Sequence, residues 1–96
     1  MLHLVFQSPI ETAVFERMDS GDVVVFLENA VLRVLQHSVL SDTLTRQLGK
    51  NRFYVLSDDI AIRGINPDEL IKGLEVIDYA GLVELAVNNP IIHSWT

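Results

Sequence analysis

The sequence predicts a single α/β domain built on a mostly parallel sheet of about five strands, with helices on both faces. Short apolar runs alternate with segments of helical spacing along the chain, which is the pattern of parallel strands joined by helices. The unbroken run Val23-Val24-Val25-Phe26-Leu27 is typical of a central strand that is covered on both faces. A length of 96 residues, 49% of them hydrophobic, leaves room for one core, so residues 1–96 form one domain.

The expected strands are short apolar runs, because runs of four to six such residues suit a strand better than a helix. Turn-forming or polar residues bound each run, and the β-branched and aromatic content is high. These strands cover residues 2–6, 23–27, 52–56, 74–77 and 91–95.

Several helix starts carry a capping signal. Ser8-Pro9, followed by Glu11, predicts a capped helix that ends at Asp19-Ser20-Gly21. Asn66-Pro67 with two acidic residues repeats this logic, and we expect a brief helix as far as Lys72-Gly73. Asp78 is expected to cap the last helix, whose apolar face would consist of Tyr79, Leu82, Val83 and Ala86.

The other connections also have helical character. Residues 30–40 predict one helix, and a second through Leu44 and Leu48 ends at Gly49. Residues 57–59 open a short helix that Gly64 ends.

Composition narrows the classes of function. The net charge is −6 and the basic residues form no stripe, which disfavours direct binding to a phosphate backbone. No basic leader and no apolar run long enough for a bilayer is seen, so we expect a soluble, cytoplasmic protein without membrane contact. The chain contains no cysteine, which excludes disulfides, thiolate metal sites, persulfides and cysteine nucleophiles of its own.

Chemistry in a parallel sheet is expected where the strands end. The segments after the strands are Gln7-Ser8, Glu28-Asn29, Ser57-Asp58-Asp59 and Asp78-Tyr79. Asp58 and Asp59 could act in acid-base chemistry or bind a hard cation, but helix capping is the favoured interpretation.

The histidines carry no metal or catalytic signature. Only His3 and His93 could meet, on neighbouring strands, and ordinary sheet positions are the favoured interpretation for both. No nucleophile elbow, phosphate-binding glycine loop or His-Glu helix motif is found. The sequence therefore predicts no catalytic, cofactor-binding or metal-binding residue.

Trp95 is expected to pack against something, because a large aromatic side chain close to a chain end gains nothing when it is exposed. Its own domain and another subunit are equally open as the packing partner. Ile91 and Ile92 belong to the same question.

Over nearly its whole length the chain resembles the TusB/DsrH family of small α/β proteins. The likeness depends on the order and spacing of four stretches. These are Met1-Leu2-His3 with Ser8-Pro9; Gly21-Asp22, the following strand and Glu28; Tyr54-Val55-Leu56 with Asp58-Asp59-Ile60-Ala61 and Arg63-Gly64; and Ile77-Asp78-Tyr79 through Val83-Glu84-Leu85 to Ser94-Trp95.

The resemblance implies a subunit that assembles with TusC-like and TusD-like proteins into a heterohexamer, a dimer of heterotrimers. Such complexes pass persulfide sulfur toward 2-thiouridine at the wobble position of tRNA. The related DsrEFH complex serves sulfur oxidation instead, and its DsrH-type subunit can carry a cysteine. Since this chain has no cysteine, the resemblance favours the complex that supplies sulfur for tRNA thiolation. In that complex the chain would be a non-catalytic structural subunit with only indirect contact with tRNA. The sequence departs from the family at Asn29-Ala30, where relatives tend to have a glycine after the acidic residue.

The candidate subunit interface comprises polar residues at the strand ends and the apolar or aromatic residues near the chain end. Whether the isolated chain forms a homo-oligomer stays open. The rival hypothesis is a small hydrolase or metal-dependent enzyme, which predicts that Asp58, Asp59, Asp78 and a histidine converge in one pocket. The interface residues are Glu28, Asn29, Asp58, Asp59, Tyr79, Ile91, Ile92 and Trp95.

Overall fold

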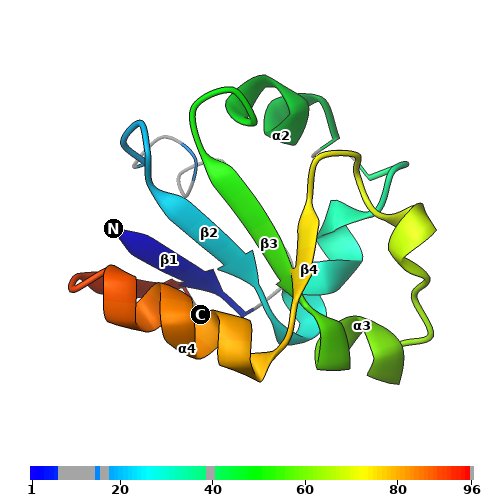
Figure 1. Ribbon diagram of the computed structural model, residues 1–96. Helices are drawn as coiled ribbons and strands as arrows, with labels where there is room; N and C mark the ends of the chain where they lie inside the picture. Colours follow the sequence, from blue (N-terminus) through cyan, green and yellow to red (C-terminus); the bar gives the residue numbers. More distant parts are fainter. Residues whose placement is uncertain (7–14, 16–17, 39–40, 96) are drawn as a thin grey trace.

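Five parallel strands form the centre of the molecule, in the order β4-β3-β2-β1-β5. The computed structural model describes residues 1–6, 15, 18–38 and 41–95 (Figure 1). Every pairing in this sheet is parallel, which confirms the predicted fold class. The helix expected to start at Ser8-Pro9 lies outside the described residues, apart from positions 15 and 18–21.

All five strands lie within one or two residues of their expected bounds. The run from Val23 forms the middle strand of the sheet, as its continuous apolar character predicts. The strands are β1 (Leu2–Val5), β2 (Val23–Phe26), β3 (Arg52–Leu56), β4 (Glu75–Ile77) and β5 (Ile92–Trp95).

Two helical segments, η1 and η2, are shorter than the sequence suggests. The helix expected over residues 30–40 is a 3-10 segment, η1 (Glu28–Val34), after which Leu35 pairs with Leu70 in an isolated antiparallel bridge. The bridge also stops η2 (Pro67–Glu69) before the expected end at Lys72-Gly73, because Leu70 and Ile71 are buried instead of continuing a helix. The α-helices among the described residues are α2 (Ser41–Gln47), α3 (Ser57–Ile62) and α4 (Tyr79–Asn88).

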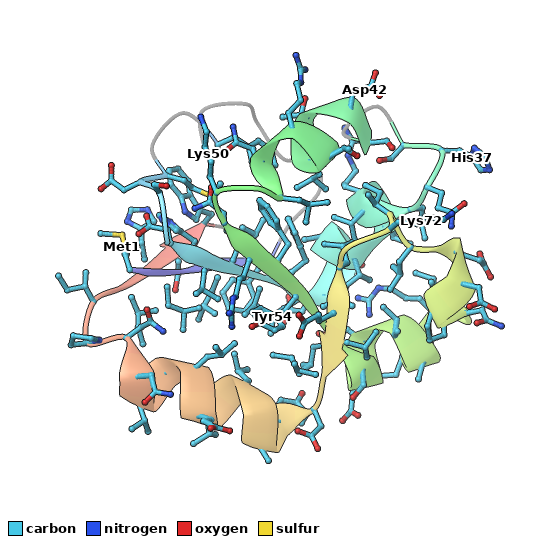
Figure 2. The ribbon with its side chains drawn as sticks, turned by 45° about the horizontal axis from the view of Figure 1, so that its top comes forward. Met1, His37, Asp42, Lys50, Tyr54 and Lys72 are labelled. Atoms are coloured by element: carbon cyan, nitrogen blue, oxygen red, sulfur yellow. The ribbon has the colours of Figure 1, made fainter. Side chains whose placement is uncertain are left out.

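The two faces of the sheet bury different sets of side chains, because neighbouring residues of a strand point to opposite sides. Val24, Phe26 and Phe53 pack with buried residues of η1, α2 and α3 on one face. On the other face, Val25 and Tyr54 pack with residues of α4. Figure 1 shows α4 on one side of the sheet and α2 on the other, and Figure 2 shows Tyr54 in the layer between the sheet and α4.

The apolar face of α4 differs from the expected one. Leu82, Leu85 and Ala86 pack against the sheet, as expected for two of these three. Tyr79 and Val83, predicted for the same face, are 56% and 61% exposed. The predicted and the observed buried residues both recur every three or four positions, as expected for one face of a helix. The observed buried face is rotated around the helix axis relative to the predicted face.

Capping of α4 and η2 follows the sequence signals. The Asp78 side chain accepts a hydrogen bond of 2.8 Å from the backbone N–H of Gly81. Asn66 and Glu69 form the reciprocal bonds of a capping box at η2. In the described part of the chain, no helix is long and apolar enough to cross a membrane.

Replacing Asp78 with alanine is expected to lower the free energy of unfolding by about 1 kcal/mol, because the first turn of α4 loses its acceptor. Asp58→Ala is the matched control, since no side-chain hydrogen bond caps α3. That change should alter stability by less than about 0.5 kcal/mol. Urea denaturation measures both, and equal losses would contradict the assignment of Asp78 as the cap.

Candidate functional site

The carboxyl ends of β2 and β3 are joined by a polar cluster, which we call the edge cluster: Glu28, Asn29, Asp59 and Arg63. The backbone N–H of Glu28 donates to Oδ2 of Asp59 at 2.7 Å. The guanidinium of Arg63 donates to Oδ1 of Asn29 at 2.9 and 3.3 Å. It also donates to the Asp59 backbone carbonyl at 3.0 Å. The structure therefore brings three predicted site residues together and adds Arg63.

Asp59 links two segments of the chain and does not cap its own helix. The residue at the N-cap of α3 is Leu56, which makes no side-chain capping hydrogen bond. The favoured capping interpretation is therefore wrong for Asp58 and Asp59. Asp58 is exposed, whereas Asp59 is turned toward the segment after β2, 31 residues earlier in the chain. A bond of this sequence separation cannot be found from local pattern.

Glu28 adopts a backbone conformation that residues with a side chain rarely take. Its φ angle is +50°, in the left-handed region where a Cβ atom costs roughly 1–2 kcal/mol. The hydrogen bond from its N–H to Asp59 holds this conformation, and Arg63 holds the next residue, Asn29. The turn after β2 is thus centred on Glu28, and the side chain of Glu28 is exposed.

The carboxylates of the rival enzyme hypothesis do not converge. Asp58 is exposed, Asp59 binds the Glu28 amide, and Asp78 caps α4. Within the described ranges, no group of three or more His, Cys, Asp or Glu side chains could hold a metal ion. The single pocket that this hypothesis requires is therefore not formed by these residues.

Trp95 is half-buried and packs in part against its own domain. Its indole Nε1–H donates to Nδ1 of His3 at 3.1 Å, and its ring centroid lies 4.4 Å from that of His93. Neighbouring strands bring His3 and His93 together as expected, in direct register. Ile91 and Ile92 stay 61% and 46% exposed.

Asp22 was not predicted as a functional position, yet it organises the start of the sheet. Its carboxylate accepts a 2.9 Å bond from Nε2 of the buried His3 and a 3.0 Å bond from the Asp19 amide. The N-terminal amine of Met1 lies 3.2 Å from Oδ1 of the same carboxylate. Burial raises the pKa of the Asp22 carboxyl, but these bonds outweigh burial and hold the pKa below its ordinary value. The buried His3 is therefore a paired structural residue.

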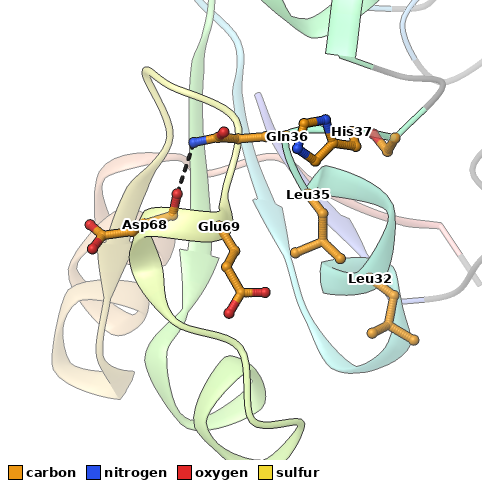
Figure 3. Close-up of a pocket in the computed structure, with 7 residues that line it drawn as sticks. Leu32, Leu35, Gln36, His37, Asp68 and Glu69 are labelled. Carbon is orange, nitrogen blue, oxygen red and sulfur yellow. Dashed lines mark hydrogen bonds between the residues drawn. The ribbon is translucent and has the colours of Figure 1, made fainter.

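A separate pocket of about 410 Å³ lies between η1 and η2 (Figure 3). Leu32 and Leu35 form its apolar side, and the side chain of Gln36 donates to the backbone carbonyl of Asp68 at 2.8 Å. Sequence reasoning missed this pocket because the Leu35–Leu70 bridge creates it from two irregular segments. None of the predicted interface residues lines it.

Comparison with known proteins decides the family. The family model described as "DsrH like protein" matches residues 6–91. The chain belongs to the DsrH-like family. This membership confirms the expected resemblance and supports a component of a sulfur relay in general.

Solved structures share the fold of the DsrH-like chain. A protein of unknown function from Methanobacterium thermoautotrophicum superposes with a TM-score of 0.77 and 16% identity, covering 98% of this chain and 96% of that one. The YchN protein of E. coli superposes with a TM-score of 0.78 and 13% identity, covering 98% and 97%. No curated protein matches the sequence significantly. At these identities the likeness establishes the fold alone.

In the DsrH-like chain, Asp22→Asn is expected to lower the free energy of unfolding by about 2 kcal/mol at pH 7, because a charged acceptor of three bonds is lost. The pKa of Asp22 is lower in the folded protein than in the unfolded protein. The carboxylate therefore contributes its full stability at a pH above the unfolded-state pKa, and this contribution is lost as the pH falls through the folded-state pKa. The difference between wild type and variant should therefore shrink below about pH 4. Chemical denaturation at pH 7, 5 and 3 measures it, and a constant difference would refute the assignment.

Glu28→Gly is expected to raise the free energy of unfolding of the DsrH-like chain by up to about 1 kcal/mol, because glycine adopts a positive φ without strain. Glu28→Ala is the control, since it removes the carboxylate but keeps the Cβ atom, and it should stay within about 0.5 kcal/mol of wild type. Thermal and urea denaturation compare the three proteins. Destabilisation by glycine relative to alanine would show that the turn is not strained.

Proposed function

We propose that this chain is a non-catalytic structural subunit of a TusBCD-type sulfur-relay complex that delivers persulfide sulfur for 2-thiolation of the tRNA wobble uridine. Membership of the DsrH-like family supports the relay. The absence of any cysteine means that sulfur must be carried by another subunit. The observation that carries the structural role is the edge cluster, which orders the carboxyl ends of β2 and β3 without any thiol.

The edge cluster suits a docking surface because its backbone is already fixed. Asp59 and Arg63 hold the turn at Glu28 and Asn29, so a partner would bind without first ordering this segment. Tyr79, the first residue of α4, follows the carboxyl end of the parallel strand β4 and offers an exposed aromatic ring. An aromatic anchor with polar neighbours is the usual composition of a protein interface.

The proposed partners are TusC-like and TusD-like subunits, arranged as a dimer of heterotrimers. In that assembly this chain contributes to catalysis by holding a neighbouring active loop in position, which requires rigid support. Contact with tRNA would be indirect, because the net charge of −6 disfavours binding to phosphates. Modification of tRNA would place the complex in the cytoplasm.

A subunit of a DsrEFH-type complex in sulfur oxidation is the second candidate. It shares the family and the fold, and the two candidates differ in the final sulfur acceptor. The missing cysteine favours the tRNA branch, since DsrH-type subunits can carry one. Loss of the thiolated wobble uridine on deletion of the gene, measured by mass spectrometry of tRNA nucleosides, would distinguish the two.

Copurification tests the structural role. The tagged chain is expected to retain TusC-like and TusD-like proteins from native cells, and Tyr79→Ala should reduce their recovery at least tenfold. Val87→Ala is the matched control, because Val87 is also exposed on α4 but lies at the opposite end of the helix. Both substitutions remove exposed side chains and should leave the fold intact.

Three outcomes would count against the proposal. A wild-type chain that retains neither partner would refute the complex itself. Equal recovery with Tyr79→Ala and Val87→Ala would move the docking surface away from the start of α4. Sulfur transfer from thiosulfate or a persulfide donor by the purified chain alone would refute the non-catalytic role.

A further inference from the structure

The outer edge of β5 offers backbone groups to another strand. β5 pairs with β1 on its inner side, and no strand in the described part of the chain pairs with its outer side. Leu2 and Phe6 donate to the carbonyls of Ile91 and Trp95, so these odd-numbered positions direct their backbone groups inward. Backbone groups alternate in direction along a strand, and those of Ile92 and Ser94 therefore point outward.

This edge lacks the charged side chains that protect many exposed sheet edges. Proteins prevent edge pairing with charged side chains, bulges or a covering segment. The opposite edge follows this rule, because β4 carries Glu75. Residues 88–95 contain no Asp, Glu, Lys or Arg, although the chain has a net charge of −6. The contrast between the two edges indicates that β5 is covered in the assembled protein.

Most side chains of β5 and the preceding Ile91 are exposed, on both faces of the sheet. Ile91 is 61% exposed and Ile92 is 46% exposed, and His93 and Ser94 are exposed as well. Val87, near the end of α4 and close in sequence to β5, is 76% exposed. A strand with accessible apolar side chains, and with outward backbone groups that no described strand pairs, is suited to pairing with another strand.

We propose that β5 pairs antiparallel with β5 of a second copy of this chain, around a two-fold axis at His93, so that two sheets become one continuous sheet. A second copy fits because a two-fold contact needs one self-complementary edge, and this edge brings no charge to a meeting of two acidic chains. The proposal concerns self-association and does not rest on the relay function.

The proline before β5 disfavours one alternative register of this pairing. With His93 on the axis, Ile92 lies opposite Ser94 of the second copy, and each such pair can exchange both of its hydrogen bonds. A shift that places Ile92 opposite itself would bring Ser94 opposite Pro90, which has no N–H to donate. The register centred on His93 therefore uses all the outward groups of Ile92 and Ser94.

Side chains support the same register. Ile91 lies opposite Trp95 of the second copy, which forms a β-branched and aromatic cross-strand pair of a favourable kind. This contact gives a reason for the exposure of Ile91. His93 lies opposite its own counterpart in a pair without hydrogen bonds between them, where the side chains approach most closely.

Single-cysteine trapping tests the register directly, and the chain has no cysteine that would interfere. His93→Cys should form a disulfide-linked dimer in oxidised glutathione, because opposite residues in such a pair have Cα atoms within the range of a disulfide. Ile92→Cys and Ser94→Cys are the controls, since each lies diagonally from its own counterpart. The His93→Cys dimer should form at least tenfold faster than either control dimer.

Charge complementation gives a second measurement that needs no covalent bond. Wild type should sediment at twice the monomer mass of 10.8 kDa at high concentration. His93→Glu and His93→Lys should each dimerise at least tenfold more weakly, and an equimolar mixture should recover the dimer. Val76→Glu on the β4 edge, a site that is also exposed, should leave the dimer unchanged.

Circular dichroism confirms that each variant is folded before its mass is measured. A wild-type chain that stays monomeric at all concentrations would overturn the proposal. So would a His93→Glu dimer as tight as wild type, a mixture of His93→Glu and His93→Lys that fails to recover, or equal trapping at positions 92, 93 and 94.

Discussion

The structure depends on the burial of the central strands on both faces of the sheet. Val24, Val25, Phe26 and Val55 are fully buried, so neither side of β2 or β3 can face water. The helical segments must therefore divide between the two faces, and only the ends and outer edges of the sheet are left for contact with other molecules. The edge cluster lies at one of these ends, and β5 forms one of these edges.

The edge cluster shows how a small domain keeps a polar surface in a fixed shape. Glu28 takes a strained conformation, and the Asp59 carboxylate holds it with a single short hydrogen bond. Arg63 extends the same arrangement to Asn29. Strain of this kind is often found where a protein binds another molecule, because the surrounding structure fixes the geometry before binding. A rigid turn is more useful to a scaffolding subunit than a reactive group.

Local sequence pattern predicted the strands and the caps at Asp78 and Asn66, because each depends on residues that are neighbours in the chain. The prediction of which face of α4 is buried was wrong. Apolar residues surround much of this helix, and packing against the sheet decides which of them are buried. The role of Asp59 and the pairing of Asp22 with His3 depend on contacts across 31 and 19 residues. The position of these contacts is set by the sheet register, which no local pattern contains.

The hydrogen bond between the last strand and the first has a practical consequence. Trp95 is the one tryptophan of the sequence, and its indole lies against His3 and His93. Fluorescence excited at the long wavelengths that only tryptophan absorbs therefore originates from β5 alone, at the edge of the sheet. Departure of that strand from its neighbour would move the fluorophore into water, so the polypeptide carries its own optical reporter for this event, without chemical labelling.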